Sequence, residues 1–151
     1  IRQELVETGY LRRGKTAAKR QKRVSGKPME FRSSSGLRIS VGKNNTQNDL
    51  LTCKQAFKSD IWFHTQKIPG SHTVVIADGK EIPDRTLEEA AVIAAYHSRA
   101  RDSALVPVDY TIIKNVKKPS GAKPGKVVYD KFETAVVTPD KERVAALLVK
   151  G

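Results

Sequence analysis

Short segments in which apolar and polar residues alternate begin near Met29 and recur through the rest of the chain. A period of two is typical of strands, because successive side chains of a strand point to opposite faces. Ser34-Ser35-Gly36 separates the first two segments and indicates a hairpin turn, and Ile68-Pro69-Gly70 separates another pair. The predicted strands span residues 29–33, 37–41, 60–65, 71–77, 106–116, 127–129 and 134–138.

Two segments carry helix-start signals, one after the second predicted strand and one after the last. Asn44 or Asn45 can cap a helix, because a short amide side chain accepts a hydrogen bond from a free amide of the first turn. The predicted apolar face of this helix consists of Leu50, Cys53 and Phe57. Thr138-Pro139-Asp140 starts the last helix, with proline at its first turn. The predicted inner face of the last helix consists of Val144, Leu147 and Leu148.

The helix between them has the clearest pattern. Thr86 and Glu89 have the spacing of a capping box, in which each side chain satisfies an amide at the helix start. The body at 90–100 is rich in alanine and apolar almost all round, which predicts burial on more than one side. The number and mixed order of the elements favour a single α+β domain with a largely antiparallel mixed sheet and about three helices.

The charge of the chain is strongly positive. The 151 residues include 28 Lys or Arg and 16 Asp or Glu, which gives a net charge of +12 and a pI near 10.0. Such an excess favours a polyanionic partner, either nucleic acid or an anionic membrane, over a merely soluble basic protein. No apolar run approaches the length of a membrane span, so we expect no membrane partner.

The first 28 residues differ from the rest, with nine basic and two acidic residues and few apolar ones. We expect residues 1–28 to be a basic linker and residues 29–151 to form the folded domain. The chain opens on Ile1 in what looks like the tail of a helix, which suggests a fragment of a longer protein. One cysteine, Cys53, excludes an internal disulfide, favours a reducing and therefore cytoplasmic compartment, and is expected to be a small core residue.

Two loops are candidates for nucleic-acid binding. The first lies between Ile113 and Val127, where glycine and proline interleave with lysines suited to phosphate contact. Its lysines are Lys114, Lys117, Lys118, Lys123 and Lys126. The second follows the strand at 37–41 and offers an anion seat at a helix start. Its candidate residues are Lys43, Asn44, Asn45 and Asn48. A solvated charge run is the alternative for the first loop, and ordinary capping by asparagine is the alternative for the second.

A third group of residues lies on one face of the strand at 60–65 and just after the following turn. It consists of Asp60, Trp62, His64 and His72. Asp60, His64 and His72 could bind a metal if the two strands pair with matching faces, and His97 could join them. Trp62 could instead stack on a nucleic-acid base, or it could simply lie in the core. No His-x-x-x-His motif or cysteine pair supports a metal, so no cofactor is expected.

With these residues in view, the chain resembles the NFACT-R domain, the C-terminal module of the RqcH/NEMF family, whose members are also described as fibronectin-binding protein A-like proteins. The resemblance covers roughly residues 29–138 in order. It rests on Gly42-Lys-Asn-Asn45 with Asn48-Asp49, Asp60-Ile-Trp-Phe-His64, Ile68-Pro-Gly-Ser-His72, Thr86-Leu-Glu-Glu-Ala-Ala91, Val106-Pro-Val-Asp-Tyr-Thr111 and Val116-Lys-Lys-Pro-Ser-Gly-Ala-Lys-Pro-Gly125. The basic segment before Met29 resembles the end of the family's coiled-coil region.

The resemblance implies ribosome-associated quality control. Full-length members of the family bind the stalled large ribosomal subunit with its tRNA and support C-terminal alanine tailing of the nascent chain, while ribosomal RNA performs the peptidyl transfer. The resemblance therefore implies an RNA-binding module that is not itself an enzyme, whose partners are rRNA or tRNA and the other domains of the full-length protein. Two alternatives remain, namely a surface adhesin that binds fibronectin and a metal-dependent enzyme built on Asp60, His64 and His72.

Overall fold

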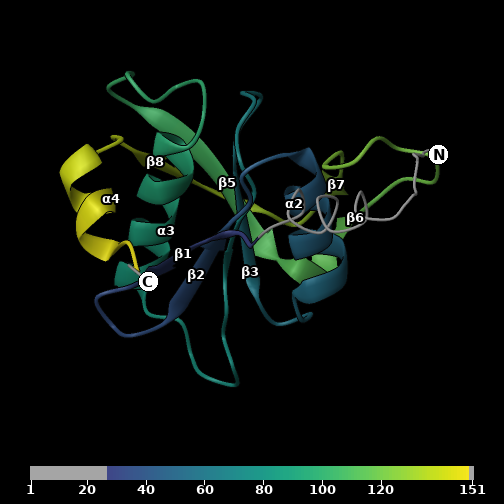
Figure 1. The fold of residues 1–151 in the computed structure, drawn as a ribbon, viewed down its shortest axis with the longest axis horizontal. Helices are drawn as coiled ribbons and strands as arrows, with labels where there is room; N and C mark the ends of the chain where they lie inside the picture. Colours follow the sequence, from purple (N-terminus) through teal and green to yellow (C-terminus); the bar gives the residue numbers. More distant parts are fainter. Residues whose placement is uncertain (1–26, 150–151) are drawn as a thin grey trace, which may run out of the picture.

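The computed structural model describes residues 27–149, and its fold is the α+β domain that the sequence predicts (Figure 1). Most of the basic segment at 1–28 lies outside the described residues. The strands are β1 (Met29–Arg32), β2 (Arg38–Val41), β3 (Ile61–Thr65), β4 (Thr73–Val75), β5 (Val106–Ile112), β6 (Val116–Lys117), β7 (Val128–Tyr129) and β8 (Glu133–Val137). The helices are α2 (Asn45–Leu50), α3 (Asp84–Tyr96) and α4 (Lys141–Leu147), with a π-helical turn η1 (Leu51–Gln55) and a 3₁₀ turn η2 (Ile113–Asn115).

Six strands form one sheet in the order β1-β2-β4-β3-β5-β8, and all neighbouring strands are antiparallel. The predicted hairpin at the start of the domain is confirmed, because β1 pairs with β2 and Met29 lies opposite Val41. The motif strand β3 lies inside the sheet, between β4 and β5. The predicted long strand at 106–116 is interrupted by η2, after which β6 pairs with β7 in a separate small sheet.

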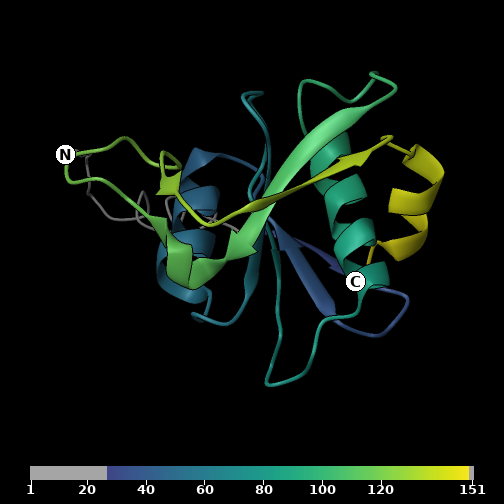
Figure 2. The same ribbon diagram turned by 180° about the vertical axis from the view of Figure 1, so that it is seen from behind.

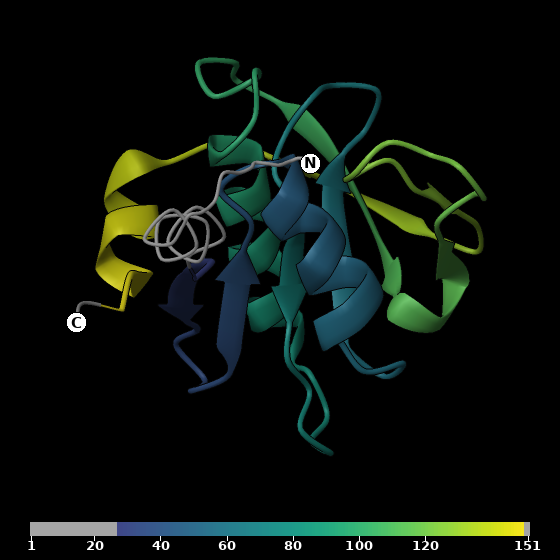
Figure 3. The ribbon, with the colours of Figure 1, turned by 45° about the vertical axis from the view of Figure 1, so that its right-hand side comes forward.

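Each face of the large sheet is covered by different elements. Figures 1 and 2 show α3 and α4 on one side of the sheet, with α2 and the β6–β7 pair on the other. Figure 3 shows the same arrangement from the side, with α2 in front of the strands and α3 behind them. The sheet is therefore a middle layer that is buried on both faces.

The alternation along β3 divides its side chains between two hydrophobic clusters. Phe63 packs with Val75 against the alanine-rich α3, whereas Trp62 packs with Val74 and Leu51 on the opposite face. The predicted burial of α3 on several sides is confirmed, since every residue from Ala90 to Ala95 is buried. Period-two alternation in β3 thus places Trp62 on the same side of the sheet as the lysine-rich loop.

The predicted capping box on α3 is wrong. The helix begins at Asp84 after Pro83, so Thr86 and Glu89 lie within its first turns. The Thr86 hydroxyl donates to Ser33 Oγ at 3.1 Å, and Glu89 Oε1 accepts from the Ser34 amide at 3.0 Å. The two side chains bind the β1–β2 turn because that turn packs beside the helix, which is a tertiary contact that local spacing does not report. The helix also ends at Tyr96, earlier than predicted.

The predicted apolar face of the first helix is also wrong. Cys53 is exposed, so it is not a core residue, and Phe57 is 73% exposed. The buried residues of this segment are Gln47, Asn48, Leu51 and Thr52. The helix widens into the π-helical turn η1, which rotates later side chains out of the 3.6-residue phase. In the last helix Val144 is buried and Leu147 is partly buried, as predicted, but Leu148 is 40% exposed.

Candidate nucleic-acid interface

His72 connects the motif strands to the lysine-rich loop. Its Nε2–H donates to the carbonyl oxygen of Gly125 at 3.0 Å, so Nδ1 is the acceptor for the Thr52 hydroxyl at 2.7 Å. The side chain is only 2% exposed, and this burial, with the neighbouring His64, lowers its pKa from 6.5 to about 4. His72 is therefore a neutral group with a fixed tautomer at physiological pH.

Asp49 fastens the same loop at a second place. Its Oδ2 forms an ion pair with Lys118 Nζ at 2.9 Å, and its Oδ1 accepts from the Gly125 amide at 3.1 Å. Burial raises the pKa of the Asp49 carboxyl, but these hydrogen bonds and the Lys118 charge outweigh burial and hold the pKa below its ordinary value. The two predicted binding loops are thus neighbours, because Asp49 belongs to α2, which follows Lys43 directly.

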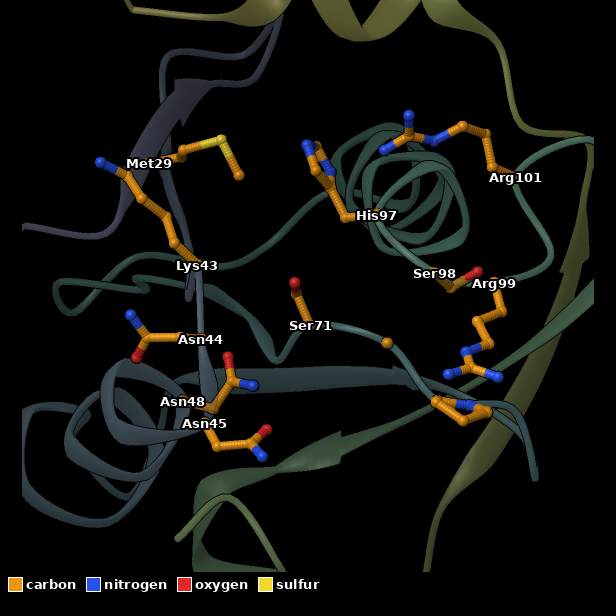
Figure 4. Close-up of a pocket in the computed structure, with 12 residues that line it drawn as sticks. Met29, Lys43, Asn44, Asn45, Asn48, Ser71, His97, Ser98, Arg99 and Arg101 are labelled. Carbon is orange, nitrogen blue, oxygen red and sulfur yellow. The ribbon is translucent and has the colours of Figure 1, made fainter.

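One hollow lies between the start of α2 and the end of α3, and we call it the Lys43 hollow (Figure 4). Its volume is about 430 Å³. Figure 4 shows Lys43, Asn44 and Asn45 on one side, with Arg99 and Arg101 on the other. Arg101 is held in place, because its Nε donates to the Tyr96 carbonyl oxygen at 2.9 Å and its guanidinium lies 4.4 Å from the centre of the Tyr96 ring.

A second hollow of about 630 Å³ lies beside the first, and we call it the Trp62 hollow. Its aromatic wall consists of Trp62, His64, His72 and Tyr129. Its cationic lining residues are Lys67, Lys123 and Lys126. Both hollows are lined by Asn45, Asn48, Pro69 and Gly70, so they adjoin. The lysine-rich loop therefore forms one edge of a hollow whose floor comes from β3.

The charges of the two hollows have a single sign. The Lys43 hollow contains Lys43, Arg99 and Arg101, and the Trp62 hollow contains three lysines. Among the residues that the structure describes, no Asp or Glu lines either one. Adjoining concave surfaces with one sign of charge concentrate ions of the opposite sign. Lys114 and Lys117 are exposed but line neither hollow, and Lys118 is engaged by Asp49.

The predicted asparagines have different roles. Asn44 caps α2, since its Oδ1 accepts a hydrogen bond from the Gln47 amide at 2.8 Å. Ordinary capping by asparagine was the alternative to an anion seat in the sequence analysis. Asn48 is buried, and its Oδ1 accepts from the His72 amide at 3.1 Å. Asn45 is exposed and lines both hollows. Asn44 is also exposed and lines the Lys43 hollow, so Asn44 and Asn45 are the two asparagines at the surface of the hollows.

Asp60 is a structural residue in this fold. It is 1% exposed, and its carboxylate accepts from the Phe57 amide and the Ala77 amide, each at 2.9 Å. It therefore holds the loop before β3 against the end of β4 and does not meet His64 and His72 at a common point. Residues 27–149 contain no group of three His, Cys, Asp or Glu that could hold a metal ion. Trp62 is 1% exposed and lies in the core, as one of its two interpretations predicts.

Comparison with known proteins places this geometry in a family. Residues 27–131 match the family model described as the NFACT protein RNA binding domain. The chain belongs to this family. The resemblance noted from the motifs is therefore confirmed, and the two hollows are features of an NFACT RNA-binding domain.

Full-length relatives are much longer than this chain. The domain is 51% identical over 148 residues to the Rqc2 homolog RqcH of Bacillus subtilis and 46% identical over 150 residues to that of Streptococcus suis. These matches cover 97% and 99% of the chain but 26% of each relative. The chain thus spans about a quarter of the length of these curated relatives. The family model that the chain matches is described as an RNA binding domain.

A solved structure also shares the fold. It is that of the C-terminal part of the fibronectin/fibrinogen-binding protein of Streptococcus suis, with a TM-score of 0.78 and 44% identity. The match covers 82% of this chain and 50% of the other.

Within residues 27–149, no helix of the NFACT RNA-binding domain is long and apolar enough to cross a membrane.

Four residues of the two hollows were not among the binding candidates that the sequence patterns indicate. They are Lys67, Arg99, Arg101 and Tyr129. Asp109, which accepts a hydrogen bond from Tyr129 without lining a hollow, was not indicated either. Lys67 directly precedes the Ile68-Pro69-Gly70 turn, which is a usable signal for an exposed cation. Asp109 interrupts an otherwise apolar strand, which marks a buried carboxylate with partners. Arg99 and Arg101 lie at the end of the predicted helix, and nothing local in the sequence connects them to Lys43.

Proposed function

We propose that this domain binds ribosomal RNA or tRNA on the large ribosomal subunit through the surface formed by the Lys43 and Trp62 hollows. The observation that carries the proposal is the set of six cations, three in each of two adjoining hollows, with no acid in the described lining of either. Lysine and arginine contacts to phosphate position an RNA without reading its sequence. The partner is therefore a phosphate backbone that crosses the Pro69-Gly70 segment between the hollows.

The proposed biological setting is ribosome quality control in the cytoplasm. The relatives named as Rqc2 homologs support this setting, because the chain matches their sequences over nearly its whole length. In this proposal the longer protein binds the stalled large subunit with tRNA, and this domain supplies RNA contacts that support alanine tailing. The domain is not itself an enzyme, and its other partners are the remaining domains of the full-length protein.

The test is a measurement of affinity for a structured RNA over a series of salt concentrations. Replacing Lys67, Lys123 and Lys126 by alanine is expected to reduce the slope of log affinity against log salt by about two to three units, because each phosphate contact releases a counterion. The matched control replaces Lys54, Lys58 and Lys80, which are exposed and line neither hollow. The control removes the same net charge, so equal slopes for the two triple variants would contradict the proposal.

A second candidate function is binding of fibronectin, which is favoured by the name of the Streptococcus suis protein whose C-terminal part shares this fold. The same two triple variants separate the candidates. If fibronectin is the partner, purified fibronectin binds the domain in high salt and after RNase treatment, and the loss of three lysines from the Trp62 hollow leaves the RNA-independent binding unchanged.

A further inference from the structure

The Trp62 hollow has an interior that differs from its edge. The Trp62 and His64 rings are parallel within 3°, with centroids 5.7 Å apart, and the Tyr129 ring centroid lies 4.6 Å from that of Trp62. His64 and Tyr129 are half-buried, whereas Trp62 and His72 are buried. The hollow therefore has a partly accessible aromatic rim above a buried aromatic floor.

Tyr129 is held in one orientation. Its hydroxyl donates to Asp109 Oδ2 at 2.6 Å, and the other oxygen of this buried carboxylate accepts from Thr134 Oγ1 at 2.7 Å and from Gln66 Nε2 at 3.0 Å. The Phe132 ring packs against the Tyr129 ring at 5.1 Å in an edge-to-face contact. A flat aromatic ring fixed in this way is a stacking surface that needs little ordering when a ligand arrives.

The indole N–H of Trp62 has no hydrogen-bond partner among the described residues, although its side chain is buried. A buried donor without an acceptor is energetically unfavourable. Trp62 forms part of the wall of the hollow, so this donor belongs to a residue that any group entering the hollow would contact.

Charge distinguishes the interior from the edge. Burial keeps His72 neutral, and burial also lowers the pKa of His64, so the interior favours an uncharged group. Lys67, Lys123 and Lys126 supply the positive charge of the lining. A nucleobase fits the interior, because it offers a flat π face and ring acceptor atoms, whereas its flanking phosphates fit the lysines.

We propose that the Trp62 hollow receives one unpaired base of the bound RNA, stacked against Tyr129 and His64. This inference rests on the proposed function and deepens it, because it specifies single-stranded RNA at this part of the surface. In paired RNA the bases are stacked on one another, so a duplex reaches the lysines but not the rim.

The experiment uses the one tryptophan of the chain as its reporter. The ¹⁵N-labelled domain is titrated with a short single-stranded RNA and with a blunt-ended RNA duplex, while fluorescence anisotropy of labelled RNA measures total binding. The single-stranded RNA is expected to shift the only indole N–H resonance with the same midpoint as the anisotropy curve. The duplex is expected to bind without shifting it.

The outcomes separate the inference from the proposed function. If single-stranded RNA binds but the indole resonance does not move, the inference of a base pocket is overturned, while the proposal of RNA binding stands. An equal indole shift with the duplex also overturns the base pocket. If neither RNA binds the domain, the proposed function itself is overturned.

Variants of the rim give a second measurement. Tyr129→Leu is expected to weaken single-stranded RNA binding about 10-fold, because it removes the stacking ring, while duplex binding stays the same. Tyr129→Phe retains the ring face and is expected to restore most of the affinity, although it loses the bond to Asp109. Val128→Ala is the matched control, because Val128 is exposed on the same strand and does not line the hollow. Equal losses from Tyr129→Leu and Val128→Ala would overturn the inference.

Discussion

The imidazole of His72 donates a hydrogen bond across 3.0 Å to the carbonyl oxygen of Gly125, a residue that lies 53 positions further along the chain. The Gly125 amide in turn donates to Asp49. One residue of the lysine-rich loop is thus held through both of its backbone polar groups. We therefore expect His72 to affect RNA binding indirectly, through the position of the loop.

The first prediction concerns this bond. His72→Gln is expected to lower the free energy of unfolding by about 1–3 kcal/mol, because the bonds to Gly125 and Thr52 are lost or weakened in a buried site. RNA affinity is expected to fall as well, while the slope against salt stays the same, because no lysine is removed. Urea unfolding and the salt series measure both quantities. Gln55→Ala, at an exposed position of η1, is the control and is expected to leave both unchanged.

The second prediction concerns pH. The pKa of His72 is about 4 in the folded domain and near 6.5 when the chain is unfolded, because of burial and the neighbouring His64. Between these values the unfolded chain binds the proton more strongly, so the domain loses stability as pH falls from about 6.5 towards 4. The contribution of His72 lowers the free energy of unfolding by about 3 kcal/mol over this range, because each unit of pKa difference corresponds to about 1.4 kcal/mol. The pKa values of His64 and His97 are also lowered by burial, which acts in the same direction.

Urea unfolding measured from pH 7.5 to pH 5 checks this prediction. His72→Gln is expected to show a shallower decline than the wild-type chain, since glutamine does not titrate. Parallel declines for the two chains would show that His72 does not cause the acid sensitivity.

The third prediction separates structure from binding within the motif on β3. Asp60→Ala leaves the Phe57 and Ala77 amides without their acceptor, and each unpaired amide costs roughly 1–3 kcal/mol. The variant is expected to unfold at lower urea concentration but to keep the wild-type salt slope in RNA binding. Glu81→Ala, at an exposed position, is the control for loss of a carboxylate. A changed slope in Asp60→Ala alone would indicate that Asp60 takes part in the interface.

The fourth prediction concerns Gly42. A Cβ atom at this position would lie 2.0 Å from Asn48 Oδ1 and 2.9 Å from the Asn48 amide nitrogen. Gly42→Ala is therefore expected to cost roughly 3 kcal/mol or more, because overpacking adds to the disturbed bond between Asn48 and His72. Gly79→Ala is the comparison, because its Cβ would meet nothing within 4 Å and only its φ of +75° is unfavourable, at about 1–2 kcal/mol. Equal costs would contradict the close approach at Gly42.

Period-two alternation predicted the sheet well, because the face of each side chain in a strand follows directly from its position. Trp62 and Phe63 lie on opposite faces for this reason alone. Helix boundaries were predicted less well. Thr86 and Glu89 have the side chains of a capping box, but the same groups can bond the β1–β2 turn, and only the packed fold decides between these partners.

The candidate site was predicted as two separate loops, and the sequence could not show that these loops lie side by side in the fold. The contacts that join the loops are those of Asp49 with Lys118 and of His72 with Gly125, and they connect residues far apart in the chain. Arg99 and Arg101 join the same surface only because α3 ends beside Gly70. Tyr129 lies in a strand of only two residues, so no sequence pattern indicates that it is part of a site. Its orientation depends on the carboxylate of Asp109, which belongs to β5.

The fastening of the lysine-rich loop at Asp49 and His72 has a consequence for the thermodynamics of association. A free loop of this kind would lose backbone conformational entropy when RNA arrives, at about 1–2 kcal/mol for each residue that becomes ordered. In this domain much of that loss has already occurred during folding. RNA binding is therefore expected to show a small entropic penalty and little change in heat capacity from loop ordering, which isothermal titration calorimetry can measure directly.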